Sequence, residues 1–273
     1  MVNNKNEHVT TSKISKLPLK NKKALPRFIR QIIVASALIL ITLVVGTVAL
    51  IFTMRFVSSE NDYRSTRDYN SSLREIVYDL PISTEEHNNI NLSELDEKML
   101  LINPDYICWI KVDGTRVDHP VVRGYDNMKY VSTSFRGESN ELGAIFMDYR
   151  NKGDNLSNII IYGHNSLQGE MFGDLHRLLD DQFFNDHNYI TLLVNGSIYE
   201  FEIFSVRLSD INDRAYTPVF DSHYAFYSFA DENGAPAYAN KILTLSTCVS
   251  MGNDDLRLIV QGYLLSGENI FGS

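Results

Sequence analysis

The pattern of apolar and polar residues divides the chain into three parts. Residues 32–54 form an uninterrupted apolar run, residues 56–103 carry apolar residues at helical spacing, and short β-type runs follow from residue 104. A transmembrane helix needs about 20 consecutive apolar residues, so the first part is expected to span a membrane. The alternative is a cleaved signal peptide, whose apolar region usually covers only about 7–15 residues.

Two helices are expected between residues 56 and 103. The first covers residues 61–80 and ends at Pro81, and the second ends before Asn103 and Pro104. Their apolar residues recur at steps of three and four: Leu73, Ile76, Val77 and Leu80 in the first helix, and Leu92, Leu95, Met99 and Leu100 in the second.

Short strands dominate the rest of the chain. Hairpins are expected across Asp113-Gly114 and Asn195-Gly196, which are strong turn dipeptides. Residues 158–162 are nearly all apolar, which predicts a strand buried on both faces. Residues 171–183 have the spacing of an amphipathic helix. Many short strands with inserted helices favour a curled or barrel-like sheet, so the expected fold class is mainly β with α insertions.

One strand end carries candidate chemistry. Residues 242–247 predict a strand that ends at Cys248, and a second strand over residues 256–265 has Arg257 near its start. If the two strands pair, a thiol and a guanidinium lie at the same end of one sheet. A nearby cation lowers the pKa of a thiol and can stabilise an oxyanion. The plainer interpretation is a buried structural cysteine and a surface arginine.

A thiol nucleophile needs a base or an imidazolium as its partner. Among the seven histidines, His164 directly follows the buried strand, and Gly163 allows the chain to turn there. His164 is therefore the favoured partner of Cys248, and His119, His187 and His223 remain alternatives. Cys108 lies mid-strand beside Trp109 and is expected to be structural, although a disulfide between the two cysteines would be a competing interpretation.

Charge is distributed unevenly along the chain. The net charge is −9, yet residues 1–30 contain eight Lys and Arg residues and one acidic residue, so the remainder is strongly acidic. Nucleic-acid binding needs basic surface and is not expected. The positive-inside rule predicts that residues 1–30 are cytoplasmic and residues 56–273 extracellular. The sequence has no recognisable metal or nucleotide motif, so no cofactor is expected.

These features together resemble a known family. The segment TLSTC at residues 244–248, with Arg257 downstream and His164 upstream, resembles the signature of sortases, the transpeptidases of Gram-positive cell surfaces. The segments INPDYICWI, GTRVDHPVV and YGHNSLQGEMFGDL, with the pair Asp126-Asn127, are similar to class B sortases. The resemblance covers about residues 70–265. It implies a closed sortase-like β-barrel. Together with the hydropathy and charge pattern, it gives this expected organisation: a basic tail (1–30), a signal anchor (31–55), a helical extension (56–103) and a catalytic domain (104–273).

The resemblance also implies a mechanism. Cys248 would attack the carbonyl of a Thr–Gly or Thr–Asn bond in an NPxT- or LPxTG-like sorting signal and form a thioacyl enzyme. His164 would transfer protons, Arg257 would bind the oxyanion or the substrate backbone, and Thr247 would help to bind substrate. The implied partners are surface proteins with a sorting signal, an amine of peptidoglycan or its lipid-linked precursor, and the membrane. The alternatives are a hydrolytic cysteine peptidase and a non-enzymatic anchored surface domain.

Overall fold

The chain forms two compact units, divided between Arg55 and Phe56. The computed structural model describes residues 25–78, 92–153, 156–166, 168–248 and 255–265. Helix α1 (Arg27–Tyr78) begins in the first unit and continues into the second. The expected helix end at Pro81 and the basic tail lie outside the described residues.

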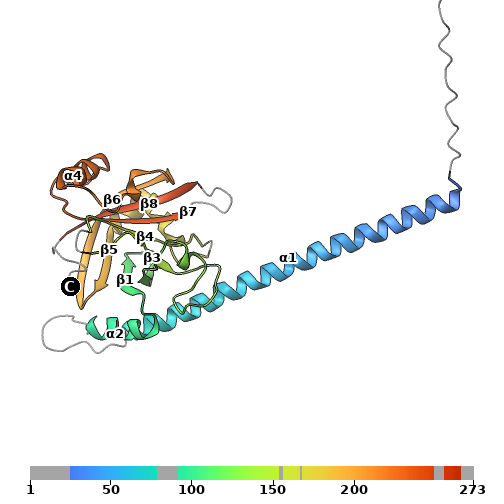
Figure 1. Ribbon diagram of the computed structural model, residues 1–273, viewed down its shortest axis with the longest axis horizontal. Coiled ribbons are helices and arrows are strands. Elements are labelled where there is room, and N and C mark those ends of the chain that lie inside the picture. Colours follow the sequence, from blue (N-terminus) through green and yellow to red (C-terminus); the bar gives the residue numbers. More distant parts are fainter. Residues whose placement is uncertain (1–24, 79–91, 154–155, 167, 249–254, 266–273) are drawn as a thin grey trace, which may run out of the picture. The chain divides into compact units, whose positions relative to one another are not determined.

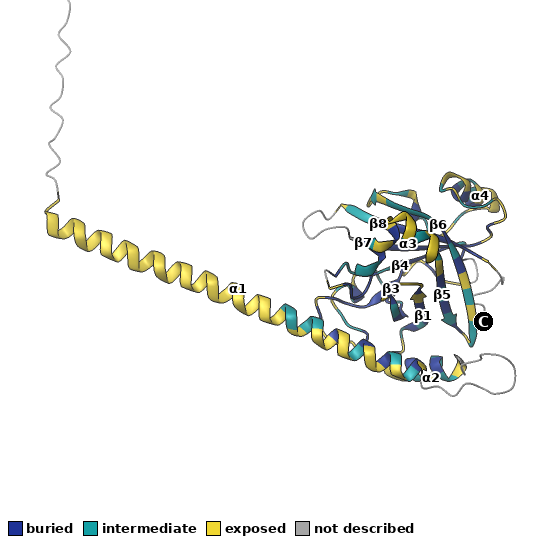
Figure 2. Ribbon diagram, turned by 180° about the vertical axis from the view of Figure 1, so that it is seen from behind, coloured by how far each residue is buried: buried dark blue, intermediate teal, exposed yellow. Residues whose placement is uncertain are grey.

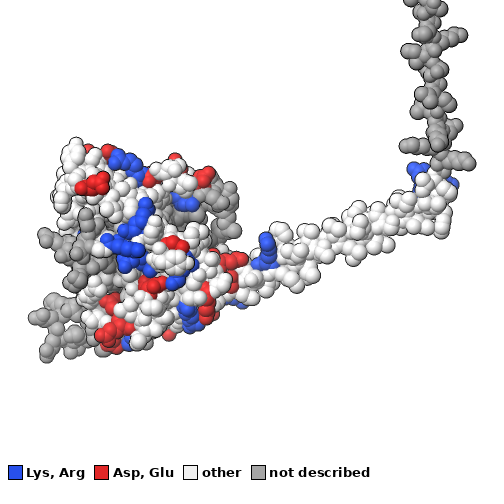
Figure 3. All heavy atoms as spheres, in the orientation of Figure 1, with Lys and Arg blue, Asp and Glu red and all other residues white. Residues whose placement is uncertain are grey.

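The first unit contains the apolar part of α1. Its most apolar window has a mean hydropathy of 2.7, and no other described helix is long and apolar enough to cross a membrane. Its side chains are exposed throughout (Figure 2), and its surface is uncharged between the basic residues near its ends (Figure 3). Thr42 and Thr47 donate their hydroxyl protons to helix carbonyls. This composition suits a membrane span, and it also suits a signal sequence.

The second unit is built on a closed barrel of eight strands (Figure 1), as the sequence predicted. The strand order is β1-β2-β3-β4-β7-β8-β6-β5. The β2–β3 and β4–β7 pairs are parallel and the other pairs are antiparallel. The strands are β1 (Tyr106–Val112), β2 (Asp118–Val122), β3 (Ile145–Met147), β4 (Asn158–Tyr162), β5 (Tyr189–Val194), β6 (Ser197–Asp210), β7 (Ile242–Cys248) and β8 (Leu256–Leu264).

Both predicted hairpins are present. β1 pairs with β2 across the Asp113-Gly114 turn, and β5 pairs with β6 across Asn195-Gly196. Asn195 and Gly196 have φ values of 50° and 71°. Two successive residues with positive φ match the right-handed twist of the strands they connect, which explains the tight two-residue turn.

Short helices fill the connections: α2 (Leu92–Ile102), η1 (Lys129–Val131), η2 (Gly173–Leu179), α3 (Asp181–Asp186), η3 (Arg214–Tyr216) and α4 (His223–Glu232). The expected single helix over residues 171–183 was wrong. Asp180 is extended, with φ −85° and ψ 123°, and its side chain accepts a hydrogen bond from the Phe183 N–H. This N-cap begins a new helix, so the segment forms η2 and α3 instead.

Apolar packing joins the helical extension to the barrel. Leu73 and Val77 of α1 and Leu95 and Met99 of α2 are buried against Trp109 of β1. Burying each large apolar side chain contributes about 1.5–3 kcal/mol, so this contact fixes both helices on the barrel. Leu100, expected in the same stripe, is 46% exposed. A separate core fills the barrel interior.

Candidate active site

The β7–β8 hairpin places the predicted thiol and guanidinium positions opposite each other. In the antiparallel register Cys248 pairs with Arg257, and Thr247 pairs with Leu258. Cys248 is the last residue of β7, and its side chain lies outside the described part of the structure. Cys248 and Arg257 therefore lie opposite each other at the end of this hairpin.

The parallel neighbour β4 brings His164 to the same end of the sheet. Tyr162 pairs with Ser246 in the β4–β7 register, and the Gly163 N–H donates to the Ser246 carbonyl at 3.2 Å. Gly163 packs so closely on Phe172 that a Cβ there would lie 2.7 Å from the Phe172 ring. Glycine, which has no Cβ, allows this close packing, and His164 follows it at the strand end.

A cavity of about 540 Å³ opens at this end of the barrel. His164, Thr247 and Arg257 all line it, so the structure brings together the described side chains of the predicted site. The complete described lining is Asn127, Val131, Phe146, Arg150, Tyr162, Gly163, His164, Ile211, Tyr216, Ser246, Thr247 and Arg257.

The His164 ring is oriented by a backbone carbonyl. Its Nε2 lies 2.7 Å from the carbonyl oxygen of Val131 in η1. A carbonyl oxygen can only accept, so Nε2 carries the proton in this arrangement and Nδ1 is the remaining nitrogen. The sequence offered no carboxylate to orient this histidine, and the carbonyl of Val131 takes that place.

Arg257 and Thr247 have different surroundings. Arg257 is partly buried, and its Nη1 donates to the Leu256 carbonyl at 3.3 Å. The hydroxyl oxygen of Thr247 is buried and has no hydrogen-bond partner among the described residues. A buried unpaired hydroxyl costs about 1–3 kcal/mol, so a ligand that bonds to it would recover that free energy.

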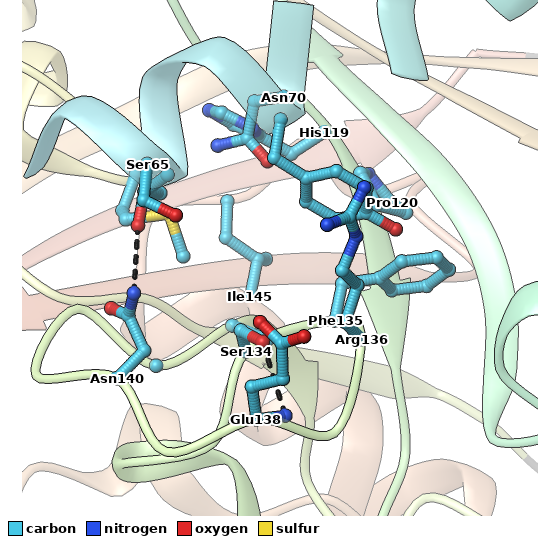
Figure 4. Close-up of a pocket in the computed structure, with 15 residues that line it drawn as sticks. Ser65, Asn70, His119, Pro120, Ser134, Phe135, Arg136, Glu138, Asn140 and Ile145 are labelled. Carbon is cyan, nitrogen blue, oxygen red and sulfur yellow. Dashed lines mark hydrogen bonds between the residues drawn. The ribbon is translucent and has the colours of Figure 1, made fainter. Parts of the chain in front are cut away.

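The alternative histidines lie elsewhere. His119 of β2 is 2% exposed and lines a smaller cavity beneath α1 (Figure 4), where burial and the nearby Arg74 lower its pKa to about 4. His187 Nδ1 lies 2.8 Å from Asp113 Oδ2 at the β1–β2 turn, and His223 is exposed at the start of α4. His164 is thus the histidine found in the larger cavity.

One wall residue was not found from the sequence. The Tyr216 hydroxyl lies 2.8 Å from Ser246 Oγ, and its ring stacks on Tyr162 with centroids 6.2 Å apart. Asp213 holds η3 in place by accepting from the Ala215 N–H at 2.7 Å and from Arg207 Nη2 at 2.9 Å. No role was predicted for Ser246, because its partner comes from a distant insertion.

Two further residues at this wall had a usable sequence signal. Asp148 directly follows β3 and supports the wall from behind, and Arg150, two residues later, lines the cavity. Polar residues placed immediately after a buried strand indicated His164, and the same reasoning applies to these two.

Cys108 is fully buried in β1 and is a free cysteine. Burial raises the pKa of its thiol above the ordinary value. The disulfide interpretation therefore finds no support, and Cys108 packs as a small apolar residue in the barrel interior.

Comparisons with known proteins agree with this architecture. The Sortase domain family model matches residues 110–265. Sortase B of Staphylococcus aureus is 27% identical over 233 residues, covering 82% of this chain and 94% of that protein. Sortase B of Listeria monocytogenes is 30% identical over 200 residues, covering 65% and 78%. A solved structure of Clostridium perfringens sortase B matches with a TM-score of 0.64 and 30% identity, covering 72% of this chain and 97% of that one.

The barrel and these matches define a cysteine transpeptidase that attaches proteins to the bacterial cell wall. The chain belongs to the sortase family, and within it to class B. Sorting-signal proteins and cell-wall amines are the substrates that this family implies.

Proposed function

We propose that Cys248, His164 and Arg257 carry out this transpeptidation on a sorting signal of the NPxT or LPxTG type. The observation that supports the assignment is the shared cavity. His164, Thr247 and Arg257 line it, at the sheet end where the register pairs Cys248 with Arg257. A nucleophile, a proton-transfer group and an oxyanion donor are the parts that acyl transfer requires.

The first half of the reaction forms a thioester. The Cys248 thiolate adds to the carbonyl carbon of the Thr–Gly or Thr–Asn bond, and negative charge develops on the carbonyl oxygen. When the C–N bond breaks, the His164 imidazolium gives its proton to the leaving amine. The products are a thioacyl enzyme and the released C-terminal fragment.

The second half transfers the acyl group to the acceptor. An amine of peptidoglycan or its lipid-linked precursor attacks the thioester carbon, and neutral His164 accepts the proton that this amine loses. The C–S bond breaks and the thiolate is restored, so the two half-reactions use His164 as acid and then as base.

Arg257 and Thr247 assist through hydrogen bonds. The guanidinium of Arg257 stabilises the thiolate and the developing oxyanion, and its several N–H donors suit this better than a lysine ammonium. Thr247 contributes its unpaired hydroxyl to substrate binding.

The apolar part of α1 is proposed to anchor the enzyme. Residues 31–55 would cross the membrane once, with the basic residues 1–30 in the cytoplasm and residues 104–273 outside as the catalytic domain. Residues 56–103 would be the helical connection between them. Protease treatment of intact cells tests this topology: the proposal requires loss of the catalytic domain while a tag at the N-terminus stays protected.

The decisive experiment uses the full chain in detergent with a library of sorting-signal peptides. With an added amine, we expect an amide product and, in mass spectra, a thioacyl adduct on Cys248 that Cys248→Ala abolishes. The library also identifies the preferred motif. Cleavage that yields only the acid, whatever amine is added, would show a hydrolase, and cleavage by Cys248→Ala would remove Cys248 from the site.

A further inference from the structure

A buried carboxylate organises one wall of the active-site cavity. Asp148, directly after β3, is 0% exposed and does not itself line the cavity. Three residues that do line it are hydrogen-bonded to its side chain. Asn127 Nδ2 donates at 3.0 Å and the Tyr162 hydroxyl at 2.9 Å, and Arg150 donates through Nε at 2.9 Å and Nη2 at 2.8 Å.

Asp148 remains ionised in this position. Burial by itself raises the pKa of a carboxyl group, but the hydrogen bonds from Arg150, Asn127 and Tyr162 outweigh burial and lower its pKa below the ordinary value. The backbone N–H of Arg150 adds a further bond at 2.9 Å. The two carboxylate oxygens are therefore occupied by donors of the protein, and this charge acts as an anchor for the wall.

Of the three side chains that Asp148 holds, Arg150 keeps hydrogen-bond donors that are not used within the described part of the protein. Its Nε and Nη2 face Asp148, and Nη2 also donates to the Tyr216 carbonyl at 3.1 Å. Nη1 makes no hydrogen bond within the described residues. The side chain of Arg150 is 42% exposed and lines the cavity. The two N–H groups of Nη1 are thus left without a partner among the described residues, on a fixed side chain that lines the cavity.

The charge of the cavity favours an anionic ligand. Among its described lining residues two are arginines and none is acidic. The ionised Asp148 behind the wall offsets the charge of Arg150, so the net positive charge at the cavity comes from Arg257. The imidazolium form of His164 that the proposed mechanism uses would add a second. Guanidinium groups bind carboxylates with planar, charge-assisted hydrogen bonds, and a guanidinium already held on one side loses little side-chain entropy when it binds.

Building on the proposed function, we propose that Arg150 is a specificity residue that binds a carboxylate carried by one of the two substrates. Asp148 is its positioning residue, because it fixes the guanidinium without touching the ligand. The carboxylate belongs either to the amino acid that supplies the acceptor amine or to an acidic side chain in the sorting signal.

The wild-type full chain in detergent tests both sources with matched substrates. The acceptor pair is Nα-acetyl-lysine and Nα-acetyl-lysinamide, which present the same side-chain amine with and without a carboxylate. The peptide pair carries Glu or Gln at the variable position of the sorting motif. In the pair that contains the natural ligand, we expect the carboxylate form to have a KM about tenfold lower, as for one charge-assisted hydrogen bond.

Variants connect this preference to Arg150 and Asp148. Arg150→Gln should bring the KM ratio of the responsive pair close to one, and Arg150→Lys, which keeps the charge but lacks the fork, should leave about a threefold preference. Asp148→Asn should also reduce this KM ratio, although Arg150 is still present, because the guanidinium is no longer fixed. A general loss of stability would affect both substrates of a pair equally and would leave the ratio unchanged. The control is Arg116→Gln, because Arg116 pairs with Asp174 away from this cavity. It should keep the full ratio.

The outcomes separate this inference from the proposed function. Equal KM values within both wild-type pairs overturn the carboxylate site, even if the variants fail to fold. A preference that survives Arg150→Gln in a folded protein overturns it as well. Absence of a thioacyl adduct and of amide product with every amine would instead contradict the proposed function of Cys248.

Discussion

Two cavities in the second unit are each lined by a histidine. The ring of one histidine is hydrogen-bonded, and the ring of the other has no hydrogen-bond partner among the described residues. In the larger cavity His164 bonds to the Val131 carbonyl at the edge of about 540 Å³ of open volume. In the smaller cavity, about 30 Å³ beneath α1 (Figure 4), both ring nitrogens of His119 and the Nδ2 of Asn70 are buried without a partner in the described residues. That volume is about the share of one water molecule in the liquid.

The difference separates a histidine that is open to a ligand from one that is packed in the fold. His164 is oriented by the Val131 carbonyl, is partly exposed and lines the same cavity as two arginines, so a ligand in that cavity can reach it. His119 is enclosed, and its lowered pKa keeps it neutral near pH 7. Residue type alone left both as candidates, and their surroundings favour His164 as the proposed partner of Cys248.

The largest expected effect is on catalysis. Cys248→Ala, His164→Ala and Arg257→Ala should each lower kcat/KM by at least about two to three orders of magnitude, because the members of a catalytic unit act together. His119→Gln should stay within a few-fold of wild type, since His119 does not line the cavity. The measurement is peptide turnover with circular dichroism as a folding check. The comparison fails if His119→Gln, still folded, loses as much as His164→Ala.

The second effect is on stability at low pH. The pKa of His119 is about 4 in the fold, compared with 6.5 for the free side chain. Between these values the unfolded chain binds more protons, so stability falls as pH falls, by up to about 1.4 kcal/mol per pH unit. Urea unfolding of wild type and His119→Gln from pH 4 to 7.5 measures this contribution.

The comparison of slopes isolates His119 from the other titrating groups. Stability of the His119→Gln variant should decline less steeply than that of wild type below pH 6.5. Equal slopes for His119→Gln and wild type would mean that His119 is readily protonated in the fold.

Local patterns were sufficient for the strands and for part of the site. The hairpins follow from turn dipeptides, and His164 follows from a polar residue after a buried strand. The break at Asp180 was missed because a side-chain cap outweighed the apolar spacing. Asp148 and Arg150 carried the same signal of polar residues after a buried strand and were overlooked. How Asp148 supports a wall that Arg150 and Tyr216 line could not be predicted, because it depends on the parallel β2–β3 and β4–β7 pairs and on η3. Such non-local pairings have no turn signal in the sequence.

A smaller effect is expected at the wall of the larger cavity. Tyr216→Phe and Ser246→Ala each remove the 2.8 Å hydrogen bond between the two hydroxyls. Such a bond contributes about 1 kcal/mol, so each variant should raise the KM for the sorting peptide about fivefold. In a double-mutant cycle the double variant should be little worse than either single one. Fully additive losses would show that the two hydroxyls do not act as a pair.

The smallest effect should come from Cys108, which has the same thiol group as Cys248 but is fully buried. Cys108→Ala should leave kcat/KM within about twofold of wild type, because its thiol packs in the barrel interior and its raised pKa suppresses the reactive thiolate. Titration with a thiol reagent should detect one thiol in the native wild type and two after unfolding, but one in both states of Cys108→Ala. If native wild type instead gave no thiol until a reductant was added, the two cysteines would be bridged. Cys248 would then be unavailable as a nucleophile in that form. The titration therefore compares the buried thiol of Cys108 with the proposed nucleophile Cys248 without measuring a rate.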